Sequence, residues 1–301
     1  MVIATGFFDG VHLGHRFVLR QLVEAARDRG DWSMVVTFWP HPRNVLQDDA
    51  RNLRLLTTME EKKKILTEIG VNYIQVIPFC RDFSRLTTEE YLRDFIMERF
   101  GGTAVLLGYD NRIGSDLRTP EETAEIAGSL GLDVIRAESY SGTDGVVISS
   151  TKIRSLLAAG KIEEASAMLG YDYQLHGVVV AGNRVGRTLG FPTANMQLYE
   201  PLKMIPGAGV YLVSVETVDK KLYGMCNIGV RPTVGTGNAM TVETNIFDFD
   251  EDIYGLDIRL TFLRKIRDEV RFPDLAALSG QLSRDRDRCL SIINGLNRAE
   301  R

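Results

Sequence analysis

The first half of the chain alternates between short apolar runs and amphipathic stretches. The apolar runs have the length of buried strands, and the stretches between them place apolar residues at helical spacing. We expect strands at 2–5, 33–38, 73–79, 104–108 and 133–137, and helices at 15–29, 59–69, 89–100 and 121–130. Strands that alternate with helices in this way predict an α/β domain, with a parallel sheet covered on both faces.

Polar residues and glycines mark the ends of these helices. Three helices begin with a capping box, in which a threonine and a glutamate satisfy free backbone N–H groups of the first turn. The three pairs are Thr58 with Glu61, Thr87 with Glu90, and Thr119 with Glu122. Glycines stand after the helices, at positions 30, 70, 101 and 131. Both signals support the helix assignments.

The pattern changes after residue 150. Two short helices are expected at 151–159 and 162–169, and a glycine follows each of them. Strands then dominate, at 174–181, 210–218, 222–228, 240–247 and 256–264, before a long amphipathic helix at 274–296. Consecutive strands separated by turns predict a small antiparallel barrel or sandwich. We therefore expect two domains, 1–170 and 171–301.

Composition narrows the class of protein. The chain has 301 residues, 44% of them hydrophobic and 25% charged, which is typical of a soluble globular protein. Its net charge of −4 is too small to suggest a nucleic-acid or membrane partner. Cys80, Cys226 and Cys289 are widely separated, which disfavours a disulfide framework or zinc site. With no signal peptide and no apolar run of about 20 residues, we expect a cytoplasmic protein.

The segment 6–15, GFFDGVHLGH, is the first candidate for chemistry. It follows the first strand and opens a helix, and parallel sheets bind ligands at the carboxyl ends of their strands. His12 and His15 share one face of the helix start, where N–H groups attract phosphate, and Gly14 lets a phosphate approach. Two imidazoles there can stabilise charge that develops on a phosphorus under attack. The alternative is a pair of surface histidines, which the glycine-rich turn disfavours.

The segment 148–154, ISSTKIR, is the second part of this candidate site. Ser149 or Ser150 can cap a helix whose first turn presents Thr151 and Arg154, and an arginine can hold phosphate oxygens. An ordinary capped helix is the alternative. The chain has neither GxGxxG nor GxxxxGK[ST], so neither dinucleotide redox chemistry nor a P-loop is supported. HxGH together with SSTxxR resembles the nucleotidyltransferase superfamily, in which an acceptor phosphate attacks the α-phosphate of ATP.

A second candidate site lies in the segment 182–195, GNRVGRTLGFPTAN. Its three glycines allow a loop around phosphates, and its two arginines supply positive charge. Thr193 and Asn195 offer hard oxygen ligands suited to Mg²⁺. Glu243, in the expected strand 240–247, can accept a proton from a bound hydroxyl. The alternatives are a mobile glycine-rich connector and a glutamate on an edge strand facing water.

The motifs in this order resemble the bacterial bifunctional riboflavin kinase/FMN adenylyltransferase family. Further shared segments are TFWPHP, NIGVRPTV, VETNIFDF and KIRDEVRF, so the resemblance runs from Gly6 to Phe272. It implies a Rossmann-like adenylyltransferase domain followed by a riboflavin kinase β-barrel with a C-terminal helix. Such an enzyme would use ATP and Mg²⁺ to convert riboflavin to FMN, and then FMN to FAD with release of pyrophosphate.

The resemblance also assigns roles by matching position. His12 and His15 would act on the ATP phosphates, with Arg154 beside them. Glu243 would be the kinase base for the ribityl hydroxyl, and Thr193 and Asn195 would hold Mg²⁺ and ATP. The remaining nucleotide-binding residues of the two sites would be Gly6, Phe8, Asp9, Gly14, Ser150 and Thr151 in the first, and Gly182, Arg187 and Gly190 in the second.

One segment departs from the family pattern. GYDNRIG, at 108–114, has Asn111 and Ile113 where phenylalanines are common, which predicts weaker packing of flavin or adenine. Two alternatives follow: a riboflavin kinase with a degenerate nucleotide-binding first domain, or a flavin-responsive binding protein without turnover. The intact histidines and Arg154 favour two activities over the first alternative, and Glu243 favours an enzyme over the second.

Overall fold

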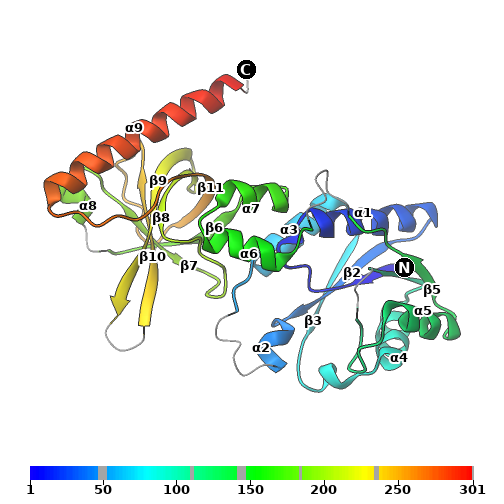
Figure 1. Cartoon of the computed structure of the whole chain (residues 1–301). Helices are drawn as coiled ribbons and strands as arrows, with labels where there is room; N and C mark the ends of the chain where they lie inside the picture. Colours follow the sequence, from blue (N-terminus) through cyan, green and yellow to red (C-terminus); the bar gives the residue numbers. More distant parts are fainter. Residues whose placement is uncertain (47–52, 109–111, 141–146, 183–184, 234–236, 300–301) are drawn as a thin grey trace. The chain divides into compact units, whose positions relative to one another are not determined.

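A computed structural model describes residues 1–46, 53–108, 112–140, 147–182, 185–233 and 237–299 (Figure 1). The contacts of the chain divide it into two compact units, Met1–Ser150 and Thr151–Arg301. Each unit has its own sheet and its own apolar core. Within the described residues, no helix combines the length and the apolar composition needed to cross a bilayer.

The first unit is built on a parallel sheet of five strands in the order β3-β2-β1-β4-β5. The strands are β1 Val2–Thr5, β2 Ser33–Trp39, β3 Tyr73–Pro78, β4 Ala104–Leu107 and β5 Asp133–Arg136. β1 is central, with Val2 opposite Ser33 on one side and Ala104 on the other. The strand order reverses between β1 and β4, and such a reversal opens a ligand-binding crevice at the carboxyl ends of the strands. The predicted parallel α/β architecture is confirmed.

Helices occupy the connections of this sheet (Figure 1). They are α1 Leu13–Asp28, α2 Pro42–Leu46, α3 Met59–Ile69, α4 Thr88–Glu90, the π-helix η4 Tyr91–Arg99, and α5 Pro120–Ser129, with the short 3₁₀ turns η1 Asp9–Val11 and η3 Phe83–Arg85. The expected helix at 89–100 therefore begins as α-helix and continues as π-helix. α2 was not predicted from the apolar pattern.

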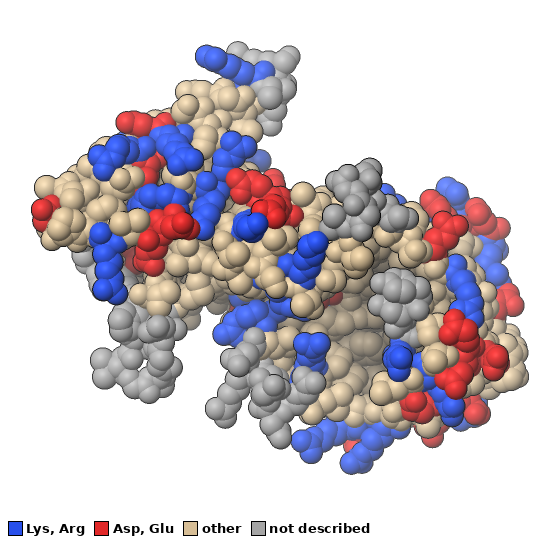
Figure 2. All heavy atoms as spheres, in the orientation of Figure 1, with Lys and Arg blue, Asp and Glu red and all other residues tan. Residues whose placement is uncertain are grey.

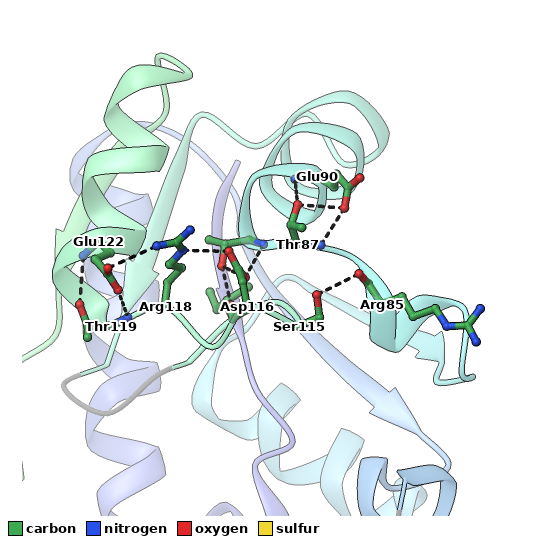
Figure 3. Close-up of polar contacts among 10 residues, drawn as sticks. Arg85, Thr87, Glu90, Ser115, Asp116, Arg118, Thr119 and Glu122 are labelled. Carbon is green, nitrogen blue, oxygen red and sulfur yellow. Dashed lines mark hydrogen bonds and ion pairs between the residues drawn. The ribbon is translucent and has the colours of Figure 1, made fainter.

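All three predicted capping boxes are present. At α3, the Glu61 N–H donates to Thr58 Oγ1 at 3.1 Å, and the Thr58 N–H donates to Glu61 Oε2 at 2.9 Å. Figure 3 shows the other two boxes on either side of Asp116. The Asp116 carboxylate accepts hydrogen bonds from the Thr88 backbone and hydroxyl, so it fastens the segment after β4 to the start of α4.

The second unit is a closed antiparallel barrel in the order β10-β7-β6-β11-β8-β9, with β9 pairing to β10. Its strands are β6 Gln174–Val180, β7 Ala194–Leu198, β8 Gly209–Glu216, β9 Lys221–Thr233, β10 Gly237–Ile246 and β11 Asp257–Arg267. The prediction of a small antiparallel barrel is confirmed. The short helix α8 Val185–Thr188 lies in the segment 182–195, which was expected to be a loop, and β7, which was not predicted, begins at the end of it.

Two helices, α6 Ser150–Ala158 and α7 Ile162–Leu169, precede the barrel and pack within its unit. The Gly207 N–H donates to the Leu157 carbonyl at 2.8 Å, and α7 packs against β11. A Cβ on Gly160 would lie 2.6 Å from the Tyr211 hydroxyl, so only glycine allows this close approach. Contacts therefore divide the chain at Ser150, and a functional boundary near residue 170 stays a prediction.

The last helix, α9 Leu275–Ala299, covers one side of the barrel (Figure 1). Cys289 and Ile293 of this helix pack against Val210, Leu212 and Met225 of β8 and β9. A buried ion pair adds to this contact, with Arg267 Nε 2.8 Å from Asp285 Oδ2, and Gln281 donates to the other carboxylate oxygen at 2.8 Å. The helix is thus held by both apolar and polar contacts.

Candidate active sites

The turn after β1 lies at the point where the strand order of the first sheet reverses. Phe8, Gly10 and Val11 have φ angles of 49°, 78° and 35°. Positive φ is unusual for phenylalanine and valine, so the surrounding structure must hold this turn in place. The Phe8 ring folds back over Gly6, where a Cβ would lie 2.8 Å from it. A side chain at position 6 would therefore displace the Phe8 ring from this position.

Asp9 braces the same turn. It is 5% exposed, and its carboxylate accepts hydrogen bonds from the N–H groups of Leu56, at 3.0 Å, and Thr57, at 3.2 Å. The Gly10 N–H donates to the Thr57 hydroxyl at 3.1 Å. The structure thus gives Asp9 a part in shaping the turn, and direct contact with a nucleotide stays a prediction.

His12 and His15 stack on each other at the start of α1. His12 is the N-cap residue, and its Nδ1 accepts the His15 backbone N–H at 3.3 Å. Their ring centroids are 3.6 Å apart, at an interplanar angle of 17°. Because Nδ1 of His12 is an acceptor, its ring hydrogen belongs on Nε2. A Cβ on Gly14 would lie 3.3 Å from the His12 ring, so this glycine leaves the helix start uncrowded.

Both rings are uncharged at neutral pH. Burial lowers the pKa of His12 to about 4, and a backbone hydrogen bond opposes this only in part. Burial also holds the pKa of His15 well below its usual range, assisted by the charge that His12 would carry when protonated and by the charge of Lys62. Among the described residues, the buried Nδ1 of His15 has no hydrogen-bond partner, and such an orphaned atom calls for a ligand or water. The pair can therefore offer hydrogen bonds to phosphate without carrying charge.

The segment ISSTKIR reaches this turn through its serine. The Ser150 hydroxyl, at the end of the first unit, donates to the Asp9 carbonyl at 2.9 Å. Thr151 is exposed and Arg154 partly buried on α6, but both belong to the second unit. Their contact with a nucleotide held by the histidines stays a prediction.

The weaker packing of flavin or adenine that was predicted from the segment 108–114 depends on two residues, Asn111 and Ile113. Ile113 is 7% exposed and belongs to the core of the first unit, with Val105 and Leu107 of β4 in the same cluster. Its side chain therefore packs inside the fold. Asn111 lies outside the described residues.

A buried charged residue that contacts this turn was not predicted from the sequence. Lys62 of α3 is 1% exposed, and its Nζ donates to the Phe7 carbonyl at 2.5 Å. A signal was available, because Lys62, Ile65 and Leu66 occupy the i, i+3 and i+4 positions of one buried helix face. A lysine on an apolar face is unusual unless it has a partner.

The segment 182–195 folds compactly in the second unit. The Phe191 N–H donates to the Gly186 carbonyl at 2.8 Å, and a Cβ on Gly186 would overlap the Phe191 carbonyl. Gly190 has a φ of 78°, which favours glycine. Arg187 lies on α8 and is exposed, whereas Arg184 lies outside the described residues.

Asn195 lies in β7 directly opposite Glu243 of β10, and Glu243 in turn lies opposite Asn227 of β9. Directly opposed residues share one face of an antiparallel sheet, with Cβ atoms about 5 Å apart. Gly182 completes the group, because a Cβ there would overlap the Asn195 amide. β10 is paired on both sides, so the alternative of an edge-strand glutamate is wrong.

Thr193 stands immediately before β7 and lines a cavity of about 330 Å³. Arg187, Thr244 and Tyr254 also line it. Thr244 and Glu243 are consecutive, so their side chains point to opposite faces of β10. The segment 192–195 therefore contributes Thr193 to the cavity and Asn195 to the face of the sheet that carries Glu243.

The residues at this site fit a magnesium ion bound together with phosphates. Among the described residues, no group of three or more histidine, cysteine, aspartate or glutamate side chains forms a metal site. Mg²⁺ commonly takes one or two protein oxygens and completes its shell with phosphate and water. The hydroxyl of Thr193 and the amide oxygen of Asn195 are donors of that kind.

On the face of the molecule that Figure 2 draws, the distribution of surface charge indicates no further binding site. Figure 2 shows Lys and Arg side chains interspersed with Asp and Glu over the visible face of each unit. Mixed signs of this kind are ordinary for a globular protein surface.

Comparison with known proteins connects both sites to one family. The family model for FAD synthetase matches residues 1–152, and that for riboflavin kinase matches residues 169–293. The bifunctional riboflavin kinase/FMN adenylyltransferase of Escherichia coli (strain K12) is 37% identical over 286 residues, which cover 94% of this chain and 90% of that protein. The protein of the same description from Bacillus subtilis (strain 168) is 32% identical, over 99% of this chain and 94% of its own.

A solved structure shares the fold. A crystal structure described as a macrolide-efflux protein from Streptococcus pneumoniae matches with a TM-score of 0.87 and 32% identity, covering 95% of this chain and 92% of that one. The two family matches favour two activities over a kinase alone. The chain therefore belongs to the bifunctional riboflavin kinase/FMN adenylyltransferase family and carries both of its catalytic domains.

Proposed function

We propose that the turn carrying His12 and His15 transfers the adenylyl group of ATP to FMN. A phosphate oxygen of FMN attacks the α-phosphorus of ATP, and the bond to the bridging oxygen of pyrophosphate breaks. The stacked, uncharged rings donate N–H groups to phosphate oxygens as negative charge grows on them. Ser150, Thr151 and Arg154 complete the nucleotide site. The observation that supports this most is the orphaned Nδ1 of His15 at a helix start beside the strand-order reversal.

The second unit, in this proposal, phosphorylates riboflavin. Thr193 and Asn195 hold Mg²⁺ with the ATP phosphates, and the metal supplies positive charge to the phosphoryl group. Glu243 accepts the proton of the ribityl hydroxyl as its oxygen bonds to the γ-phosphorus, and ADP leaves. Gly182, Arg187 and Gly190 shape the phosphate side. The opposition of Asn195 and Glu243 across β7 and β10 carries this assignment, because it sets a candidate base beside a candidate metal ligand.

One incubation tests both halves. The full chain is mixed with riboflavin, ATP and Mg²⁺, and the flavins are separated over time. We expect FMN to appear first and FAD to follow, and neither to form when EDTA replaces Mg²⁺. FMN without FAD would leave only the kinase, and unchanged riboflavin would leave only a flavin-binding protein.

We also propose that the protein works in the cytoplasm. Cys80, Cys226 and Cys289 are all free thiols, which supports a reducing compartment. Fractionation of cells that express the chain tests this, with FAD-forming activity expected in the soluble cytoplasmic fraction.

A further inference from the structure

Lys62 places a buried positive charge directly beneath the turn of the first site. Its Nζ lies 3.7 Å from the centroid of the Phe7 ring, in addition to its hydrogen bond to the Phe7 carbonyl. Burial lowers the pKa of Lys62 to about 8, and the nearby Asp9 carboxylate opposes this shift. At pH 7 the side chain is therefore still mostly an ammonium ion.

Packing alone does not account for a lysine here. An apolar side chain of similar length would fill the same space without the desolvation penalty of a buried ammonium ion. The Phe7 carbonyl also accepts a hydrogen bond from the Thr37 hydroxyl at 3.3 Å. Lys62 of α3 and Thr37 of β2 thus both donate hydrogen bonds to the carbonyl of Phe7, the residue before Phe8, where the first positive φ occurs. These two hydrogen bonds fix the backbone at the start of the turn.

The charge of Lys62 also acts on His15. Burial is the largest cause of the lowered pKa of His15, and the charged groups His12, from its own helix start, and Lys62, from α3, add to it by disfavouring protonation. The Phe8 ring lies edge-on to His15 at 5.3 Å, and the Asp9 carboxylate acts on Lys62. A protonated His15 would therefore have to form beside a second buried cation.

We propose that Lys62 is a positioning residue for adenylyl transfer, because its hydrogen bond to the Phe7 carbonyl fixes the turn that carries His12 and His15. Its charge, added to the larger effect of burial, disfavours protonation of His15. The inference rests on the proposed assignment of adenylyl transfer to this turn. Lys62 acts through its neighbours, since its ammonium group is enclosed by the Phe7 ring and carbonyl and does not need to touch the nucleotide.

Three variants of the full chain test this. Lys62→Met removes the charge and keeps the side-chain volume, Lys62→Arg keeps the charge, and Lys63→Met is the matched control at an exposed position of the same helix. FAD formation from FMN is measured from pH 5 to pH 9, and riboflavin phosphorylation in the same samples reports on the second unit. Imidazole ¹⁵N spectra follow the protonation of His15 without relying on activity.

We expect Lys62→Met to lower the maximal rate of FAD formation about tenfold or more, because small displacements of catalytic groups are costly. The acid limb of its pH profile, and the titration of His15, should move to higher pH. Lys62→Arg should keep the His15 titration of the wild type and lose less activity, Lys63→Met should match the wild type, and the kinase rate should be unchanged throughout.

A folded Lys62→Met variant with a wild-type rate and wild-type His15 titration would overturn the proposal. If Lys62→Met does not fold, the Lys62→Arg variant tests the proposal instead. Because arginine keeps the positive charge, a shift of the His15 titration to higher pH in this variant would also overturn the proposal. Failure of the underlying assignment looks different. In that case His15→Ala would form FAD at the full rate, whereas His15 would still titrate at higher pH in Lys62→Met.

Discussion

At the scale of single residues, short motifs predicted candidate side chains for the chemistry and their proximity, but not their electrostatic state. HxGH predicted that His12 and His15 lie together, and they stack. That both rings are uncharged follows from burial, to which Lys62 adds at His15, and both effects come from contacts across the fold and from no local motif. Glu243 was predicted as a base, and its opposition to Asn195 arises from strand register.

Replacement of Glu243 by glutamine tests its role as the kinase base. We expect Glu243→Gln to lower riboflavin phosphorylation about 100-fold or more, the usual effect of losing a general base, while riboflavin still binds. Initial rates and a fluorescence titration of riboflavin measure the two effects. FMN formation at the wild-type rate would show that another group takes the proton.

Replacement of His15 by alanine tests the first site. His15→Ala should lower the maximal rate of FAD formation more than it weakens FMN binding, because the charge on the phosphates grows toward the transition state. Riboflavin phosphorylation, carried by the other unit, serves as the internal control and should not change. A full rate at saturating ATP and FMN would contradict the proposed role of the histidine pair.

At the scale of elements, local signals predicted most of the first unit and less of the second. The capping boxes formed as expected, because a threonine and a glutamate three residues apart need no distant partner. The sequence ANMQL of β7 has little strand character, and it follows a run rich in glycine. β7 exists because β6 and β10 pair with it on both sides, which no local pattern encodes.

The ion pair under α9 gives a prediction about stability. Asp285→Asn should lower the free energy of unfolding by about 2 kcal/mol, because it weakens a buried, charged hydrogen bond to Arg267. Asp248→Asn is the matched control, since Asp248 pairs with Arg286 at the surface and asparagine tolerates its positive φ. It should change stability by less than about 1 kcal/mol. Urea unfolding monitored in the second unit measures the stability of both variants. Equal losses of stability would show that the buried pair contributes no more than the surface pair.

At the scale of the whole chain, composition and the change of pattern near residue 150 predicted two units. What they did not show is that α6 and α7 belong with the barrel. Ile162, Ala165 and Leu169 of α7 are fully buried, and Glu163 pairs with Arg264 of β11. A helix whose apolar face lies on a neighbouring sheet is part of that folding unit.

Two fragments test this division. The fragment Thr151–Arg301 should fold and phosphorylate riboflavin, and it should make no FAD from FMN. A fragment that starts at Tyr171 lacks α7 and should be much less stable, because each buried aliphatic side chain lost costs about 2–5 kcal/mol against a total of about 5–15 kcal/mol. Circular dichroism and kinase assays compare the two fragments. Equal stability would show that α6 and α7 are only a connector.

The double pairing of β10 limits how this enzyme can change over evolutionary time. Side chains alternate between the two faces of a strand, so inserting or deleting one residue within β10 would move Glu243 to the other face. Thr244 or Val242 would take its place beside Asn195, while the strand could still pair with β7 and β9. Insertions and deletions should therefore be confined to segments outside the paired strands β7, β9 and β10. The pairing of Asn195 with Glu243 should be retained even where many neighbouring residues are substituted.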